Sequence, residues 1–181
     1  MSNDPLACWN TKHVKMSGTS DRVEETSIKV AKQCKYWYHA VDQPGQTIEF
    51  RLSAKRDASA AKRFTKSMMR ADHGRLPLSV SVAQNAAYPE AFTASQEEKI
   101  LPKDCQLRRV KYLNNVIEQD HRFIKKKERA SQGCKRFRTA ERTPESIAAV
   151  NLMRKGQVKR LAGSDAQGQA KFVESLFGVA A

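Results

Sequence analysis

The chain has 181 residues, enough for one domain with a sizeable core. Its 33 Lys and Arg against 19 Asp and Glu give a formal net charge of +14, which favours phosphate backbones, acidic proteins or anionic membrane surfaces as partners. No segment approaches the roughly 18 apolar residues that a membrane span needs, and the N-terminus lacks an apolar signal core. The sequence therefore predicts a cytoplasmic protein.

The cysteines and histidines give no metal or disulfide signal. No two cysteines form the CxxC pair that zinc sites use, and no histidine lies three or four residues from another histidine or a cysteine. We expect reduced thiols, and histidines in the core or on the surface.

Residues 1–21 are polar, lack a clear period and contain Pro5 and Gly18, so we expect an irregular leader. From Val23 to Val30 the chain alternates, which predicts a strand with Glu24 on the face of Ile28 and Val30.

Residues 36–42 (YWYHAVD) and 47–53 (TIEFRLS) are aromatic and β-branched runs joined by a Gln-Pro-Gly-Gln linker. This pattern predicts a β-hairpin. Ile48, Phe50 and Leu52 are expected on one face of the second strand. Three antiparallel strands would then open the domain.

Helices and strands are predicted to alternate after the hairpin. Asp57 can cap a helix to about residue 69, with Ala61, Phe64 and Met68 inward. We then expect a strand over 78–82, a helix over 87–99 and a strand over 106–110.

Two more helices complete the predicted core, which we place at residues 22–157. The first is capped by Asn114 or Asn115 and ends in a lysine run, with apolar positions 116, 117, 123 and 124 inward. The second covers about 142–154, with Ile147, Val150 and Leu152 inward. Residues 158–181 form a partly packed tail whose apolar patch is Phe172, Val173, Leu176 and Phe177.

The resulting order is β-β-β-α-β-α-β-α-α. This α/β layout, a mixed sheet with helices on both faces, is typical of the ribonuclease-H-like fold, although other α+β folds share parts of it.

The helix over 112–127 (YLNNVIEQDHRFIKKK) carries the most chemical information. Glu118, Arg122 and Lys125 fall at i, i+4 and i+7, so one face presents a carboxylate and two cations. Such a face can hold a metal ion and a phosphate, or it can be a solvated face with an ordinary ion pair. Asp120 falls on the apolar stripe, so either it is a hydrogen-bonded buried acid or the helix is rotated slightly.

Basic residues are concentrated around this helix. Residues 121–142 contain nine Lys or Arg against two Glu, which favours DNA phosphates, a solvated basic surface being the alternative. The candidate DNA-binding residues are Arg108, Arg109, Lys111, Arg122, Lys125, Lys126, Lys127, Lys135, Arg136 and Arg138. By strand alternation, the aromatic residues at 36–38 are expected in the core rather than as platforms for bases.

Several blocks resemble one family, the insertion-sequence transposases of the type named insertion sequence six, a branch of the DDE class. The blocks run in family order from about residue 23 to 157: YWYHAVD with TIEFRLSAKRD, NAAYPEA, RRVKYLNNVIEQDHRFIKKK, GCKRFRTAERT and NLMRKGQV.

The resemblance implies a retroviral-integrase-like catalytic core in which Asp, Asp and Glu hold two Mg²⁺ ions for DNA strand transfer. The three catalytic positions fall on Glu24, Ala83 and Glu118, so Glu24 and Glu118 are the expected metal ligands. The 34 residues between Ala83 and Glu118 match the family spacing.

Two substitutions at these positions predict weak or absent catalysis. Ala83 has no oxygen to offer a metal ion, and Glu24 has one methylene more than Asp. Relatives carry a helix-turn-helix before the core, so residues 1–21 look truncated or remodelled. The expected partners are transposon ends, target DNA and further copies of the chain, in a prokaryotic cytoplasm at the nucleoid. The alternative is a noncatalytic regulatory module that binds DNA.

Overall fold

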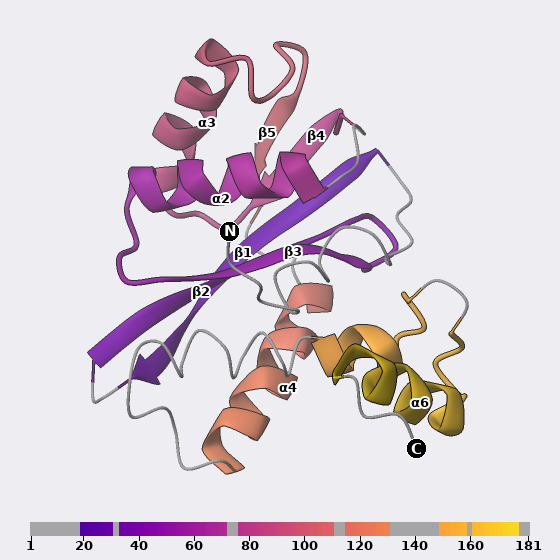
Figure 1. Ribbon diagram of the computed structural model, residues 1–181. Helices are drawn as coiled ribbons and strands as arrows, with labels where there is room; N and C mark the ends of the chain where they lie inside the picture. Colours follow the sequence, from indigo (N-terminus) through magenta and orange to yellow (C-terminus); the bar gives the residue numbers. More distant parts are fainter. Residues whose placement is uncertain are drawn as a thin grey trace.

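The computed structural model describes residues 19–30, 33–71, 76–110, 115–130, 149–158 and 161–177. One mixed sheet has the strand order β3-β2-β1-β4-β5 (Figure 1). Its strands are β1 (Ser20–Val30), β2 (Gln33–Val41), β3 (Thr47–Ser53), β4 (Ser79–Val82) and β5 (Gln106–Arg109). The first three pair antiparallel, and β4 pairs parallel with both β1 and β5. The predicted strands are confirmed.

Strand β1 begins at Ser20, three residues before the alternating pattern. Residues 20–23 pair with residues 79–82 of β4, and the Leu78 amide donates to the Thr19 carbonyl at 2.8 Å. The partner strand thus supplies ladder hydrogen bonds to residues that carry no hydrophobic pattern of their own.

The turn between β2 and β3 has the predicted hairpin geometry. The Gly45 amide donates to the Asp42 carbonyl at 3.0 Å, and Gly45 has φ +87°, where glycine is favoured. The Gln46 amide donates to Asp42 Oδ1 at 2.7 Å.

Helices α2 (Ala58–Ala71) and α3 (Ala87–Glu97) cover one face of the sheet (Figure 1). Asp57 Oδ1 accepts from the Ala60 amide at 2.8 Å, which confirms the predicted cap. Ala61, Phe64 and Met68 are buried as expected. They pack with Val23, Tyr38, Val80 and Val82 in a cluster that we call the α2 core.

Ile48 is an exception to the predicted pattern. It lies in the α2 core, whereas Phe50 and Leu52 lie on the opposite face of the sheet. The pairing of β2 with β3 shifts at Ala40/Val41, which leaves Ile48 as the extra residue of a β-bulge. An inserted residue inverts the alternation beyond it, so the predicted shared face was wrong.

The other face is covered by α4 (Asn115–Ala130), a short helix at residues 149–154 and α6 (Ala166–Phe177). These elements lie on the far side of the sheet from α2 and α3 (Figure 1). The cluster between them and the sheet, which we call the α4 core, contains Ile28, Val30, Trp37, Phe50, Leu52, Ile124, Ala149, Leu152, Met153, Val158 and Leu161.

The C-terminal predictions are confirmed only in part. Leu152 is buried, whereas Val150 is 46% exposed, so its inward assignment was wrong. Phe172 and Val173 pack against the α4 core from α6, a helix that the expected tail lacked. Ile147 lies outside the described residues. Among the helices that the structure describes, none is long and apolar enough to cross a membrane.

Of the two alternatives for Asp120, a hydrogen-bonded buried acid or a slightly rotated helix, the structure confirms the first. Its carboxylate accepts from Asn151 Nδ2 at 2.9 Å and from Lys155 Nζ at 2.5 Å. Lys155 also donates to the Gly45 carbonyl at 3.3 Å. One carboxylate therefore ties α4 to the C-terminal segment and, through Lys155, to the hairpin turn.

Replacing Asp120 should loosen this connection. Asp120→Ala is expected to lower the free energy of unfolding by about 2 kcal/mol, because hydrogen bonds to a charged group contribute about 1.5–3 kcal/mol and Lys155 can be partly rehydrated. Urea unfolding measures the change, and Gln119→Ala, on the exposed side of α4, is the control. Equal stability of the two variants would contradict the role of Asp120.

Candidate functional site

Glu24 in β1 and Ala83, the residue that follows β4, come directly after the last paired residues of two parallel strands. Val23 pairs with Val82 in the β1–β4 ladder, and Glu24 and Ala83 are the next residue of each chain segment, where β4 ends. Val23 and Val82 both belong to the α2 core. Since strand side chains alternate, Glu24 and Ala83 lie on the face of α4.

Glu118 comes to the same place from the first turn of α4. Burial, the largest cause, and the nearby carboxylates of Glu25 and Glu118 together raise the pKa of Glu24 to about 7, while Lys125 acts in the opposite direction. The electrostatic effect of Glu118 on Glu24 places the two carboxylates in one neighbourhood.

Glu24 has a buried carboxylate oxygen that no hydrogen bond from the described residues satisfies. Its Oε2 atom is buried and has no hydrogen-bond partner among the described residues, and the nearest ring nitrogen, His121 Nδ1, is 4.0 Å away. Such an oxygen suits a cation, but the third position of the set is the methyl group of Ala83. Within the described ranges no three or more His, Cys, Asp or Glu side chains form a metal-binding group. The residues present do not fit a site that needs three carboxylates.

Two neutral histidines lie beneath Glu24. His39 is directly opposite Glu24 on β2, and its ring centroid is 5.8 Å from that of His121. Burial lowers the pKa of each to about 3. His39 Nε2 lies 3.1 Å from Thr47 Oγ1 and 4.0 Å from Asp120, a carboxylate already engaged by Lys155. This layer therefore offers no positive charge to Glu24.

The sequence pattern gave no role to this pair of histidines beyond core or surface, and the core assignment is confirmed for His39 and His121. The sequence does contain a signal for the grouping of these histidines near the carboxylates, because His121 follows Glu118 by three residues on one helix and His39 falls on the α4 face of β2. Only the strand register placed His39 opposite Glu24.

His39 should make the protein sensitive to mild acid. Its pKa is about 3 when folded and near 6.5 when unfolded, so the unfolded chain binds the extra proton and stability falls as the pH drops below 6.5. Between pH 7 and pH 5 this amounts to about 2 kcal/mol. Between pH 7 and pH 5, His39→Gln should lose about 2 kcal/mol less of its free energy of unfolding than the wild type loses, as measured by urea unfolding at the two pH values. Glu24 titrates in the opposite sense in both proteins, so an equal loss in wild type and variant would contradict the assignment.

Glu25 faces the opposite side of the sheet and has a structural role. Its side chain is 1% exposed and accepts from Arg56 Nε at 2.8 Å, Arg56 Nη2 at 2.5 Å, Asn85 Nδ2 at 2.8 Å and the Tyr88 hydroxyl. It thus holds the residues before α2 and the β4–α3 loop to β1. Because Asn85 is engaged there, its side chain does not take the place of the carboxylate that the family resemblance implies at position 83.

The basic candidates fall into several groups. Arg122 pairs with Glu118 at 2.9 Å, the expected i,i+4 contact, and its side chain is 76% exposed. Lys125 is half-buried and Lys126 is exposed. Arg108 and Arg109 are both exposed on β5. The remaining candidates lie outside the described residues or, for Lys127, have a side chain that is not described: Lys111, Lys127, Lys135, Arg136 and Arg138.

Comparison with known proteins shows similarity to a protein family and to curated transposases. The family model described as DDE domain matches residues 18–157. The transposase for insertion sequence-like element IS431mec and the transposase for insertion sequence element IS257 in transposon Tn4003, both of Staphylococcus aureus, are each 33% identical over 147 residues. These 147 residues are 81% of this chain and 62% of each relative, so the match spans less than two thirds of the relatives' length.

Solved structures with this fold include retroviral integrases. A chain of the simian T-cell lymphotropic virus intasome bound to PP2A regulatory subunit B56 gamma superposes with a TM-score of 0.54 and 11% identity, over 78% of this chain and 52% of that one. The HTLV-2 integrase catalytic core domain in complex with magnesium, in its dimeric form, gives 0.50 and 10% identity, over 72% and 84%. The ribonuclease-H-like, integrase-core fold expected from the sequence is confirmed.

Proposed function

Since the chain belongs to the DDE-domain family of insertion-sequence transposases, we propose that it is a transposase core that binds DNA but has lost most of its strand-transfer activity. The observation that carries the proposal is Ala83 beside Glu24 at the end of β4. In this proposal the backbone positions of the DDE residues are retained, and one of the three carboxylates is missing.

The proposed loss of activity follows from coordination chemistry. Mg²⁺ takes oxygen ligands in a near-ideal octahedral geometry, and in two-ion sites the metals stabilise the attacking and leaving oxygens of phosphoryl transfer. Loss of even an outer-sphere partner of a metal ligand lowers metal affinity or activity by about 10- to 100-fold, so loss of a direct ligand should lower them more. The extra methylene of Glu24 displaces its carboxylate oxygens by about 1 Å relative to those of Asp, and a displacement of this size can lower the rate about 10²-fold. Magnesium binding is therefore expected to be weak.

DNA binding is proposed to survive because it depends on charge rather than on the metal. The chain has a net charge of +14, and Arg108, Arg109 and Lys126 are exposed. For duplex DNA the logarithm of the binding constant should fall with a slope of about 0.9 per phosphate neutralised as salt is raised. Six contacts would reduce the affinity about 10³-fold between about 50 and 200 mM salt.

The test has a binding arm and a strand-transfer arm. The purified chain should bind duplex DNA with this salt dependence, measured by fluorescence anisotropy, and should give little strand transfer on DNA carrying transposon ends with Mg²⁺ or Mn²⁺. Efficient strand transfer would overturn the proposed loss of activity. Absence of salt-dependent binding would overturn the DNA-binding role.

A noncatalytic regulatory module is the second candidate, because an intact scaffold with an incomplete site can occupy DNA without cutting it. Tighter binding to transposon ends than to random DNA would favour this role, whereas equal binding would favour a nonspecific degenerate core. We further propose that copies associate with one another in the prokaryotic cytoplasm at the nucleoid, which light scattering with and without DNA would test.

A further inference from the structure

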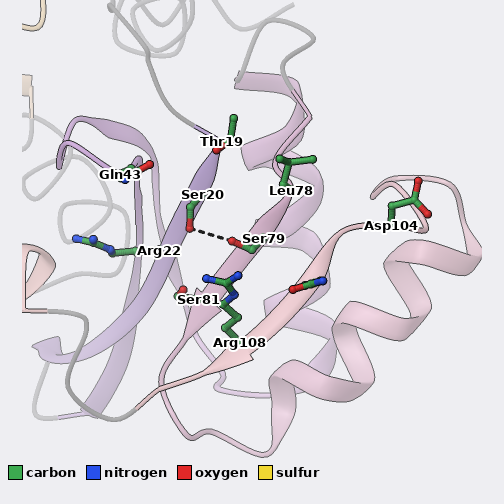
Figure 2. A pocket seen from close by; sticks show the side chains of 10 residues that line it. Thr19, Ser20, Arg22, Gln43, Leu78, Ser79, Ser81, Asp104 and Arg108 are labelled. Carbon is green, nitrogen blue, oxygen red and sulfur yellow. Dashed lines mark hydrogen bonds between the residues drawn. The ribbon is translucent and has the colours of Figure 1, made fainter.

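A polar groove of about 580 Å³ lies over β1, β4 and β5, beside the candidate site (Figure 2). Its floor is made of two rows of paired residues. Ser20, Ser79 and Gln106 form one row, and Arg22, Ser81 and Arg108 form the next. The rows place two arginines and three serines on one face of three adjacent strands. Thr19, Gln43, Leu78 and Asp104 complete the lining.

Strand alternation fixes which face this is. Val80 and Val82 belong to the α2 core, and Leu107 packs against it. Ser81 and Arg108 therefore lie on the opposite face, which is the face of Glu24 and Ala83. Arg109, the neighbour of Arg108, lies on the α2 side, so the two adjacent arginines serve different surfaces.

The groove is built to attract an anion. Neither Arg22 nor Arg108 forms an ion pair with any residue that the structure describes, and Asp104 is the one acidic residue among the lining residues. In Figure 2 Arg108 reaches from β5 toward Ser79 and Ser81, whereas Arg22 extends from β1 on the side of Gln43. Guanidinium groups are the preferred cationic partners of phosphate oxygens, because their planar N–H groups match them in pairs.

The floor beneath the arginines supplies further polar groups. Ser79 and Ser81 are almost fully buried, 5% and 4% exposed, and Ser79 Oγ lies 2.9 Å from Ser20 Oγ. Small-molecule sites are lined mostly by apolar side chains with a few polar groups, whereas nine of the ten residues that line this groove are polar or charged. Leu78 at the rim is 63% exposed and offers an apolar surface that suits a deoxyribose ring.

We propose that this groove binds the sugar-phosphate backbone of a DNA strand through Arg22 and Arg108. Arg22 and Glu24 lie on the same strand and face, so their positions are roughly 7 Å apart along β1. A strand that passes the candidate site at Glu24 and Ala83 would cross the groove next. The inference rests on the proposed DNA-binding function and assigns part of it to a surface outside the carboxylate positions and the basic helix α4.

The test compares two double variants of the full chain by fluorescence anisotropy on a duplex of random sequence over a salt series. Arg22→Gln/Arg108→Gln removes the two groove cations. Arg51→Gln/Arg63→Gln removes two exposed arginines that line a smaller hollow between β3 and α2, so both variants lose the same charge. The groove variant should reduce the salt slope by roughly 2, about 0.9 for each lost phosphate contact, and the control should keep the wild-type slope. Each single groove variant should reduce it by roughly 1.

The outcomes separate this inference from the proposed function. If the wild-type chain shows no salt-dependent binding, the DNA-binding function fails. If it binds and the two double variants behave alike, the groove assignment alone fails. Binding of inorganic phosphate that needs Arg22 and Arg108, with an unchanged DNA slope, would also overturn the assignment to DNA. Thermal unfolding verifies that each variant is folded, which is expected because glutamine preserves much of the side chain at these positions.

Discussion

Restoring aspartate at both substituted positions should recover strand transfer. Glu24→Asp/Ala83→Asp is expected to raise the rate in Mg²⁺ by at least about 10²-fold and up to about 10⁴-fold over the wild-type chain, the product of a missing ligand and a displaced one. The reason is geometric, because Glu24 and Ala83 already lie side by side on parallel strands and Glu118 already affects the charge of Glu24. The assay joins labelled transposon-end DNA to a plasmid target.

A binding measurement keeps this prediction testable even if the described core needs other segments for turnover. Mg²⁺ should raise the unfolding temperature of the restored variant and leave the wild type unchanged, since a ligand at 100 times its Kd stabilises by about 2.7 kcal/mol. Without Mg²⁺ the restored variant should be the less stable of the two, because it adds a like charge beside another. Glu24→Asp/Ala86→Asp is the matched control, because Ala86 is exposed in the same loop. Equal magnesium effects in the restored and control variants would show that Ala83 is not a ligand position.

Removing Glu25 should cause the largest loss of stability. Glu25→Ala is expected to lower the free energy of unfolding by about 3 kcal/mol, because breaking a buried charged network by removing one partner typically costs about 3–5 kcal/mol. We place the value at the low end because Arg56 is 46% exposed and water can solvate it. Tyr88 is buried, so its hydroxyl group would lose its charged acceptor without gaining water.

Two companion variants isolate the cause of this loss. Glu25→Gln keeps an acceptor oxygen, so its free energy of unfolding should fall less than that of Glu25→Ala. Glu97→Ala removes an exposed carboxylate at the end of α3 and should change stability little. Urea unfolding of the three proteins measures the differences. A loss below about 1 kcal/mol for Glu25→Ala would mean that the network does not hold the β4–α3 loop.

The features that the sequence predicts well are those that depend on local periodicity. Alternation in β1 assigned Glu24 to the face of Ile28 and Val30, and the structure confirms it. Helical spacing in α4 identified Asp120 as an acid on an apolar stripe, and it is buried. The proposal that Ala83 and Glu118 belong to one site came from the family motif, because no periodicity in the sequence connects the two positions.

The features that the sequence did not predict depend on pairing between distant segments. The β-bulge at Ile48 arises from the shifted register of two strands, and no single residue signals it. The groove needs β1, β4 and β5 to align Arg22 with Ser81 and Arg108, although each of these strands by itself is unremarkable. Arg22 was therefore absent from the candidate DNA-binding residues.

The two consecutive glutamates of β1 have a consequence for how this strand finds its place during folding. A slip of one residue would exchange the faces of Glu24 and Glu25 while leaving a carboxylate on each side of the sheet. A slip that brings Glu25 to the place of Glu24 also puts Thr26 in the place of Glu25, so the contacts of Glu25 with Arg56 and Tyr88 are lost. The apolar residues oppose the same slip, because it would move Val23 out of the α2 core and Ile28 and Val30 out of the α4 core. The acid network on one face and the aliphatic side chains on both faces thus decide together which of two consecutive acids stands at the end of β4.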